Sequence, residues 1–316
     1  MAYMIIRKLY KILLILVAGL FICAVLGKIA VAASDNATAA GDFLNIGVSA
    51  RAAGLGGAYT SVASDASAAY WNPGGLASIE SPQLIFSHFA WYQDISYEYL
   101  AVALPAADKF AFSFQASYLN YGTIEGYDIY DNPTGDINST YDLATGLTAA
   151  YRVTDNLSTG LTAKYIILSL DNHKATAMAV DLGARYKLGN YLLGLTLANV
   201  GPDLKFDQEK ERLPISVRFG ASAYPFGPSF LGAIEIENQF YGGMSIKNGV
   251  EYNYDERYFL RAGYTFHPGQ DNRTIGHTLS FGAGAMLGPT QFDYTFSPKD
   301  KVSSESIHRF SIIFRL

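Results

Sequence analysis

The chain has 316 residues, 23 Lys or Arg against 28 Asp or Glu, and a net charge of −5, with only 16% charged residues. An acidic chain without basic runs is unsuited to nucleic-acid binding, because that function needs a positive surface against the phosphates. With Cys23 as its single cysteine, the chain cannot form an internal disulfide, so other interactions must stabilise it.

Residues 1–33 have the pattern of a secretory signal peptide. Three basic residues precede an apolar run from Ile12 to about Leu26, and small residues follow it. The alternative, a membrane anchor, is disfavoured because a spanning helix needs roughly 20 apolar residues. We expect cleavage after Ala32 or Ala33, which removes the cysteine and leaves an exported mature chain.

The next segment, residues 34–81, is rich in Ala, Gly and Ser and shows no regular alternation. Short helical turns are expected around 50–53 and 64–69, with Ser64 or Asp65 capping the second and Asn72-Pro73-Gly74 ending it. Small residues allow backbone to pack closely. This composition favours a compact plug, or hatch, inside a larger structure.

From residue 82 to 316 apolar and polar residues alternate with a period of two, which is typical of strands with one apolar and one polar face. In 215–223, for example, Val217 and Phe219 alternate with Arg218 and Gly220. The turn signals divide this region into fourteen predicted strands, a count open to an error of two. They are 82–92, 95–105, 109–121, 139–152, 156–170, 174–187, 190–200, 213–224, 228–238, 243–254, 257–267, 274–286, 289–297 and 305–316.

The links between these strands alternate in length. Tight turns at 106–108, 154–155, 188–189, 225–227, 255–256 and 287–288 alternate with mostly longer links such as 122–138 and 201–212, although the first link, near Gln93-Asp94, is short. Outer-membrane barrels show this asymmetry. A soluble sandwich or lipocalin-like barrel is the alternative, but it would have to bury too many tyrosines. The predicted fold is therefore all-β: a transmembrane antiparallel barrel of about fourteen strands, residues 82–316, around the hatch 34–81.

The same alternation assigns a set of charged residues to the lumen, because a charge facing lipid costs about 2–4 kcal/mol at the membrane midplane. Their signs are mixed, which favours ion pairs with one another or with the plug over a selectivity ring. The set is Lys164, Asp181, Arg185, Arg218, Glu235, Glu237, Lys247, Glu251, Arg261 and Asp293. We expect Leu182→Arg, on the lipid face, to abolish assembly and Asp181→Asn to be tolerated.

Three stretches of the hatch carry a resemblance to a known family: Phe43 to Gly47, the Ala-Arg-Ala-x-Gly-x-Gly-Gly-Ala run at 50–58, and Asp65-Ala66-Ser67-Ala68 leading to Tyr70-Trp71-Asn72-Pro73. Over about 40 residues the chain resembles the PorV/PorQ outer-membrane proteins, which are similar to FadL-type transporters of hydrophobic compounds. Where the family has Asn-Pro-Ala, this chain has Asn72-Pro73-Gly74. The hatch residues singled out, as structural or gating, are Arg51, Gly54, Gly56, Gly57, Asp65, Trp71, Asn72, Pro73 and Gly74.

Within the hatch, a structural turn is favoured over a ligand gate for Trp71-Asn72-Pro73. Arg51 is expected to pair with a lumenal acid rather than with a substrate.

Enzymatic chemistry finds little support. None of the five histidines is spaced for a metal site, and the glycines at 54, 56 and 57 lack the third glycine and the βαβ unit of a dinucleotide loop. A lipase-like Ser–His pair at His88 or His308 is the remaining enzymatic alternative, but no nucleophile motif accompanies it. We predict a non-enzyme without catalytic, metal or cofactor residues.

The resemblance implies an accessory role in protein export or surface display, as in type IX secretion, with translocon proteins or secreted cargo as partners. The alternative is a FadL-like transporter of hydrophobic small molecules, and a third possibility is a closed structural barrel. The short outer links, the longest being 122–138, favour the accessory role, because capture of apolar ligands usually needs larger apolar loops. Outer-membrane lipid is the expected surrounding, and no nucleic acid is expected.

Overall fold

A computed structural model describes residues 40–90, 95–122, 124–137, 140–170, 173–206, 209–268, 277–298 and 306–316. The predicted signal peptide 1–33 and the link at Gln93-Asp94 lie outside these residues.

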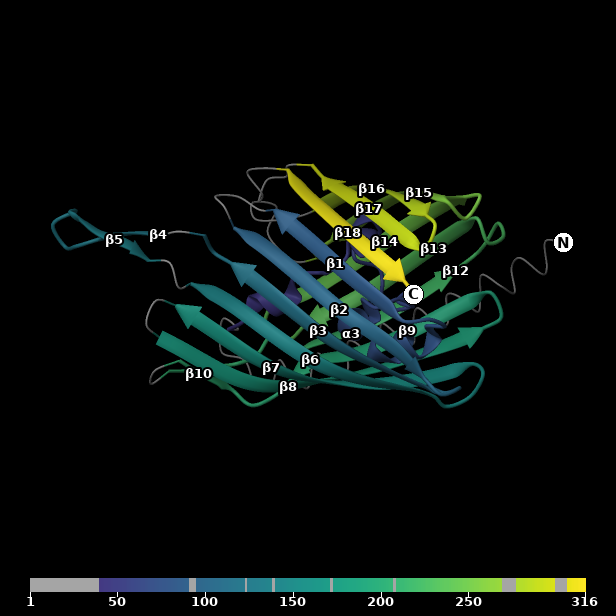
Figure 1. The fold of residues 1–316 in the computed structure, drawn as a ribbon, viewed down its shortest axis with the longest axis horizontal. Helices are drawn as coiled ribbons and strands as arrows, with labels where there is room; N and C mark the ends of the chain where they lie inside the picture. The colour runs from purple at the N-terminus through teal and green to yellow at the C-terminus, as the bar shows by residue number, and fades with distance from the viewer. Residues whose placement is uncertain are drawn as a thin grey trace.

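Fourteen antiparallel strands form one closed barrel in which β18 returns to pair with β1 (Figure 1). The closing pair runs from Gln83↔Arg315 to Ala90↔His308. The strands are β1 (Gln83–Ala90), β2 (Ser96–Ala106), β3 (Phe110–Asn120), β6 (Tyr141–Arg152), β7 (Leu157–Leu170), β8 (His173–Leu188), β9 (Tyr191–Val200), β12 (Ser216–Ala223), β13 (Phe230–Gln239), β14 (Gly243–Tyr254), β15 (Tyr258–Phe266), β16 (His277–Leu287), β17 (Thr290–Ser297) and β18 (Ile307–Arg315).

Both the fold class and the number of strands predicted from the sequence are confirmed. The strand boundaries differ by a few residues, and at one of them the reason is visible. Strand β12 begins at Ser216 and not at 213, because Pro214 has no N–H to donate to a ladder. The Ile215 N–H instead donates a hydrogen bond to Leu213 O, at 2.8 Å.

Two of the longer links contain small hairpins that the sequence prediction missed. They are β4 (Ile124–Tyr127) with β5 (Pro133–Ile137), and β10 (Leu204–Phe206) with β11 (Glu209–Glu211). The runs are too short, and the first too interrupted by Gly and Pro, to show a clear period of two. The β4–β5 hairpin projects well away from the barrel (Figure 1).

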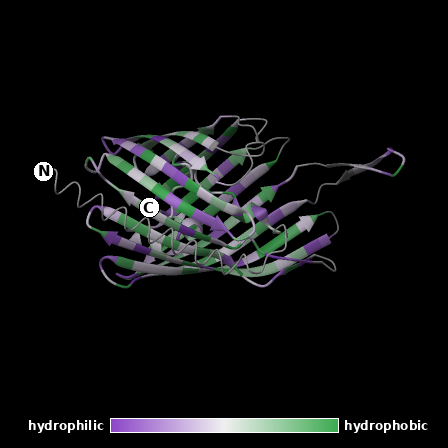
Figure 2. Cartoon of the chain, turned by 180° about the vertical axis from the view of Figure 1, so that it is seen from behind, coloured by the Kyte–Doolittle hydropathy of each residue, from purple (hydrophilic) through white to green (hydrophobic). Residues whose placement is uncertain are grey.

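The two faces of the barrel wall differ sharply in polarity, and bands of opposite hydropathy alternate along the strands (Figure 2). The outer face exposes large apolar side chains such as Leu147 (66%) and Leu182 (48%), whereas inward-facing Asp181 and Glu235 are buried. An apolar outside around a polar lumen is the arrangement of membrane barrels. No helix in the part of the chain described is long and apolar enough to cross a bilayer.

Residues 40–81, called the hatch segment below, lie inside the barrel (Figure 1). They form η1 (Asp42–Asn45), α2 (Ala50–Gly54), α3 (Ala68–Trp71) and η2 (Pro73–Ser78). Helix α3 begins at Ala68, later than predicted, because the Asp65 carboxylate accepts the Ser67 N–H at 2.9 Å and holds a turn there. Asn72 ends α3 in an extended conformation with φ −158°.

Candidate functional site: the hatch and two lumen chambers

A four-membered ion network joins the hatch segment to the barrel wall. Arg51, on α2, donates from Nε and Nη2 to the two carboxylate oxygens of Glu251 at 2.9 and 2.8 Å. Glu251 also accepts from Arg261 Nε at 2.6 Å, and Arg261 Nη1 donates to Asp293 Oδ1 at 2.7 Å. Because all four groups are largely buried, each needs the others to neutralise its charge.

A second group of charges lies where the hatch chain turns at Tyr59 and Thr60. Glu235 Oε2 accepts both of their backbone N–H groups, at 3.0 and 2.8 Å. Lys247 Nζ lies 3.5 Å from Glu235 and 2.6 Å from Glu237. Burial raises the pKa of the Tyr59 hydroxyl well above its usual value, so the phenol stays neutral and donates to Asp65 at 2.8 Å.

The remaining charges assigned to the lumen also lie on the inner face. Lys164 pairs with Asp181 at 2.6 Å within the wall, without a hydrogen bond to the hatch segment among the described residues. Arg185 donates to Ser61 O at 3.0 Å and to Ser78 Oγ at 2.6 Å. Arg218 Nη2 donates to the carbonyl oxygen of Tyr70 at 3.4 Å. The wall charges thus either satisfy hatch backbone or pair with each other.

The Trp71-Asn72-Pro73-Gly74 turn is held by hydrogen bonds to the hatch segment and to the barrel wall. Trp71 Nε1 donates to Val48 O at 3.0 Å, and Asn72 Nδ2 donates to Thr60 O and Ala184 O at 2.8 and 3.0 Å. Asn72 Oδ1 accepts the Gly74 N–H at 3.1 Å. These contacts favour a structural role for the turn.

Glycines on the inner wall let the hatch backbone lie directly against the strands. A Cβ added at Gly183 would lie 2.3 Å from Asn72 Oδ1, and one at Gly263 would lie 2.0 Å from the Gly56 N atom. Gly56 itself has φ +62°, a left-handed conformation that a side chain would strain. Paired wall glycines with such contacts are Gly160 with Gly183, Gly194 with Gly220, and Gly249 with Gly263.

Sequence reasoning missed these wall glycines and the hydroxyls that bind hatch carbonyls. Thr196 donates to Trp71 O at 3.1 Å and Thr265 to Gly56 O at 2.8 Å. Their place on the polar face of the alternation was the available signal, but it does not show which of them meets the hatch.

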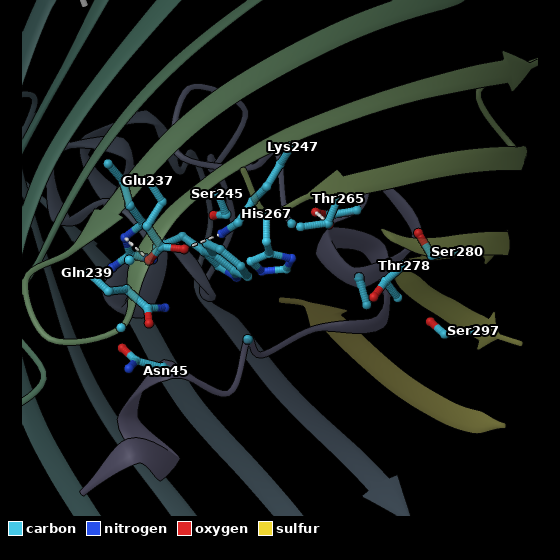
Figure 3. Close-up of a pocket in the computed structure, with 18 of the residues that line it drawn as sticks. Asn45, Glu237, Gln239, Ser245, Lys247, Thr265, His267, Thr278, Ser280 and Ser297 are labelled. Carbon is cyan, nitrogen blue, oxygen red and sulfur yellow. Dashed lines mark hydrogen bonds and ion pairs between the residues drawn. The ribbon is translucent and has the colours of Figure 1, made fainter. Parts of the chain in front are cut away.

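A cavity of about 440 Å³ lies between the hatch segment and the wall at the end of the barrel that carries the longer links; we call it the loop-side chamber (Figure 3). The hatch contributes Asn45, Tyr70 and Trp71, and the wall contributes Arg218, Lys247 and Arg309 with one carboxylate, Glu237. The rest of the wall carries the imidazole of His267 and hydroxyl and amide side chains, including Gln239, Ser245, Thr265, Thr278, Ser280 and Ser297.

A second polar cavity, of about 360 Å³, lies at the tight-turn end and is called the turn-side chamber. Arg152, Arg185 and Lys187 line it together with Glu80 and Asp155. Because the hatch segment contributes lining residues to both chambers, a solute entering from either end meets it.

The described residues contain no group of three or more His, Cys, Asp or Glu that could hold a metal ion. His88 Nδ1 lies 2.7 Å from Glu98 Oε1, and His308 Nδ1 lies 2.7 Å from the Tyr294 hydroxyl. Neither of these two contacts involves a serine.

These features define a closed fourteen-stranded barrel with an internal hatch. The sequence matches no protein-family model and no curated protein. The fold, however, is similar to solved transporter structures. The CymD monoaromatic hydrocarbon channel superposes with a TM-score of 0.59 at 16% identity, covering 86% of this chain and 98% of that one. The toluene transporter TodX of P. putida gives 0.60 at 14%, covering 85% and 98%.

A FadL homologue of Pseudomonas aeruginosa is also similar, with a TM-score of 0.57 at 12% identity and coverage of 85% of this chain and 98% of that one. At these identities the likeness concerns the fold. The fold is thus shared with FadL-type transporters, and the PorV/PorQ resemblance of the hatch sequence stays a prediction.

Proposed function

We propose that the protein is an outer-membrane transporter of hydrophobic small molecules. The observation that carries the proposal is the similarity of nearly the whole barrel to channels whose solutes are small hydrocarbons. The apolar outer face would be covered by lipid, because so much exposed apolar surface is unfavourable in water. The accessory role in export, which the sequence favoured, becomes the second candidate.

The arrangement of the lumen sets a condition on transport. The hatch segment lies between the two chambers and is held by the Arg51–Glu251 pair, by Glu235 and by close backbone contact at the wall glycines. A solute that crosses the barrel must therefore either displace part of the hatch or leave through the barrel wall before it reaches the hatch.

Uptake of radiolabelled toluene and palmitate tests the proposal in a Gram-negative host that lacks a transporter of this type. Cells that make the protein should take up at least one of the two several-fold faster than cells with an empty vector. Cells that make the Leu182→Arg variant, which we expect not to assemble, control for the effects of expression. Equal rates for both solutes in all three strains would refute the proposal.

One observation favours the second candidate, an accessory in protein export or display. The β4–β5 hairpin exposes Ile129 (90%) and Tyr130 (78%) at a tip remote from the barrel. Asp128 shapes this tip by accepting the N–H groups of Tyr130 and Asn132 at 2.8 and 2.9 Å. An exposed apolar tip of this kind is suited to contact with a partner protein.

Pull-down from membranes of the native host tests this second function. A translocon component or a secreted cargo protein should co-purify with the wild type and be lost with the double variant Ile129→Ser, Tyr130→Ser. Phe226→Ser, which removes another exposed apolar residue from a turn at the opposite end, is the matched control. Retention of the same partner by the tip variant would argue against the hairpin as its contact.

A further inference from the structure

The loop-side chamber has an excess of positive charge. Three cations line it, Arg218, Lys247 and Arg309, against the single carboxylate of Glu237. Lys247 takes the closest position on that carboxylate, 2.6 Å away, while Arg218 Nε lies 4.0 Å from it. Glu235, just outside the lining, lies 3.5 Å from Lys247 and neutralises it together with Glu237. Arg218 and Arg309 have no carboxylate as close among the described residues, so these two guanidinium groups attract anions.

Two guanidinium groups in the chamber have donors without acceptors. The Nε atoms of Arg218 and Arg309 are buried and lack a hydrogen-bond partner among the described residues. The side chain of Arg218 is 5% exposed, so its Nε has little access to bulk solvent. A buried donor without a partner is unfavourable, and a charged one more so, and an acceptor placed here would therefore be stabilised.

Aromatic rings form the floor beneath these cations. The Arg218 guanidinium lies 5.5 Å from the ring centres of both Tyr70 and Trp71, and Lys247 Nζ lies 5.8 Å from that of Trp71. The rings hold the cations in place and offer an apolar surface beside them. A ligand with an acidic end and a compact carbon body fits this combination.

The walls limit the size and nature of that body. Hydroxyl and amide groups such as Gln239, Ser245 and Ser280 surround the chamber, and Ser280 Oγ is itself buried without a hydrogen-bond partner in the described part of the chain. A long acyl chain would leave these polar groups unsatisfied. A volume of about 440 Å³ accommodates a small molecule only.

From these features we infer that the loop-side chamber is a binding site for a small organic carboxylate, whose anionic end lies at Arg218 and Arg309 and whose body lies against Trp71. The inference goes beyond the proposed function, because it assigns a small anionic ligand to this chamber in addition to the hydrophobic solutes of the transporter.

Fluorescence of Trp71 provides a direct test of binding. The chain has two tryptophans, so Trp91→Phe leaves Trp71 as the reporter at the chamber floor. The detergent-solubilised Trp91→Phe protein is titrated with cyclohexanecarboxylate and with its uncharged counterpart, cyclohexanecarboxamide. We expect a saturable change with the carboxylate and at least tenfold weaker binding of the amide.

Variants locate the site. Arg218→Gln in the same background should weaken carboxylate binding at least tenfold, while Arg257→Gln, in an exposed turn at the opposite end, should leave it unchanged. Equal binding of carboxylate and amide, or unchanged binding by a folded Arg218→Gln variant, would overturn the inference. The same saturable change with sodium chloride alone would reveal an inorganic-anion site and overturn it as well.

The comparison of carboxylate with amide requires no arginine variant, so it tests the inferred carboxylate site even if Arg218→Gln does not fold. Failure of this test is also separable from failure of the proposed function. Uptake of toluene or palmitate without carboxylate binding would support the proposed transport function and contradict only the carboxylate site. Carboxylate binding without uptake would support the site and contradict the transport function.

Discussion

Glu251 is the residue on which the main contact between hatch and wall depends, because it accepts from both Arg51 and Arg261. Glu251→Gln removes the negative charge between two buried guanidinium groups. Breaking a buried pair in this way costs about 3–5 kcal/mol, and we expect the free energy of unfolding to fall by that order. Urea unfolding in detergent, followed by Trp71 fluorescence in the Trp91→Phe background, measures the change.

The matched control is Glu256→Gln, the same substitution in the exposed turn between β14 and β15. It should change stability by less than about 0.5 kcal/mol. If Glu251→Gln proves as stable as this control, the network does not stabilise the hatch, and its charges serve another purpose.

Gly183 is a second position on which contact between the hatch and the wall depends, here through close approach of the backbone. A methyl group at this position would lie 2.3 Å from Asn72 Oδ1 and 2.7 Å from Pro73 Cδ, so the hatch must shift to accommodate Gly183→Ala. We expect a loss of about 1–3 kcal/mol and a looser hatch. Because Arg51 is the single Lys or Arg between residues 40 and 81, trypsin cleavage there reports exposure of the hatch.

Gly232→Ala is the control for that experiment, because nothing lies within 4 Å of the position its Cβ would take. Cleavage at Arg51 should be faster in the Gly183→Ala variant than in this control. Equal cleavage rates would mean that the wall yields and the hatch does not.

At the scale of elements, the β4–β5 hairpin is a separate unit. Its two strands pair with each other and belong to no other sheet. Replacing residues 124–137 with a short Gly-Ser link should therefore leave the barrel intact, since β3 and β6 pair over Phe110–Asn120 without it. Retention of the shifted gel mobility of unheated folded barrel, with a midpoint of heat unfolding within about 2 °C of wild type, checks this. A barrel that fails to form would show that the hairpin guides β3–β6 pairing.

For the whole molecule, the polarity of the two barrel faces decides assembly in a bilayer. Leu182 is 48% exposed on the outer face, and Leu182→Arg would place a charge in lipid at a cost of about 2–4 kcal/mol near the midplane. We expect little assembled protein in the outer-membrane fraction, whereas Leu182→Phe should assemble normally. Equal amounts of both variants would contradict the lipid-facing assignment.

The structure changes our expectation for the neighbouring Asp181→Asn. Asp181 is fully buried and lies 2.6 Å from Lys164, so the substitution leaves a buried ammonium without its carboxylate. A loss of stability is now expected in a barrel that still assembles, because the change lies on the lumen side.

The period-two alternation by itself determined the strands and the facing of their residues, because that information is local: neighbouring side chains in a strand point to opposite sides. It therefore placed Leu182 outside and Asp181 inside without knowledge of any partner. The small hairpins and the start of β12 were missed, because short runs and a proline interrupt the same local signal.

Only the tertiary structure decided how the lumen is used. The contact of Arg51 with Glu251 joins residues 200 positions apart, and Gly183 meets Asn72, which is 183 − 72 = 111 positions away in the chain. Such pairings depend on barrel closure by β1 and β18, on strand register and on the path of the hatch. None of these produces a periodic pattern in the amino-acid sequence. For the same reason, the presence of Arg218 and Arg309 in one chamber followed from the closed barrel and not from their spacing.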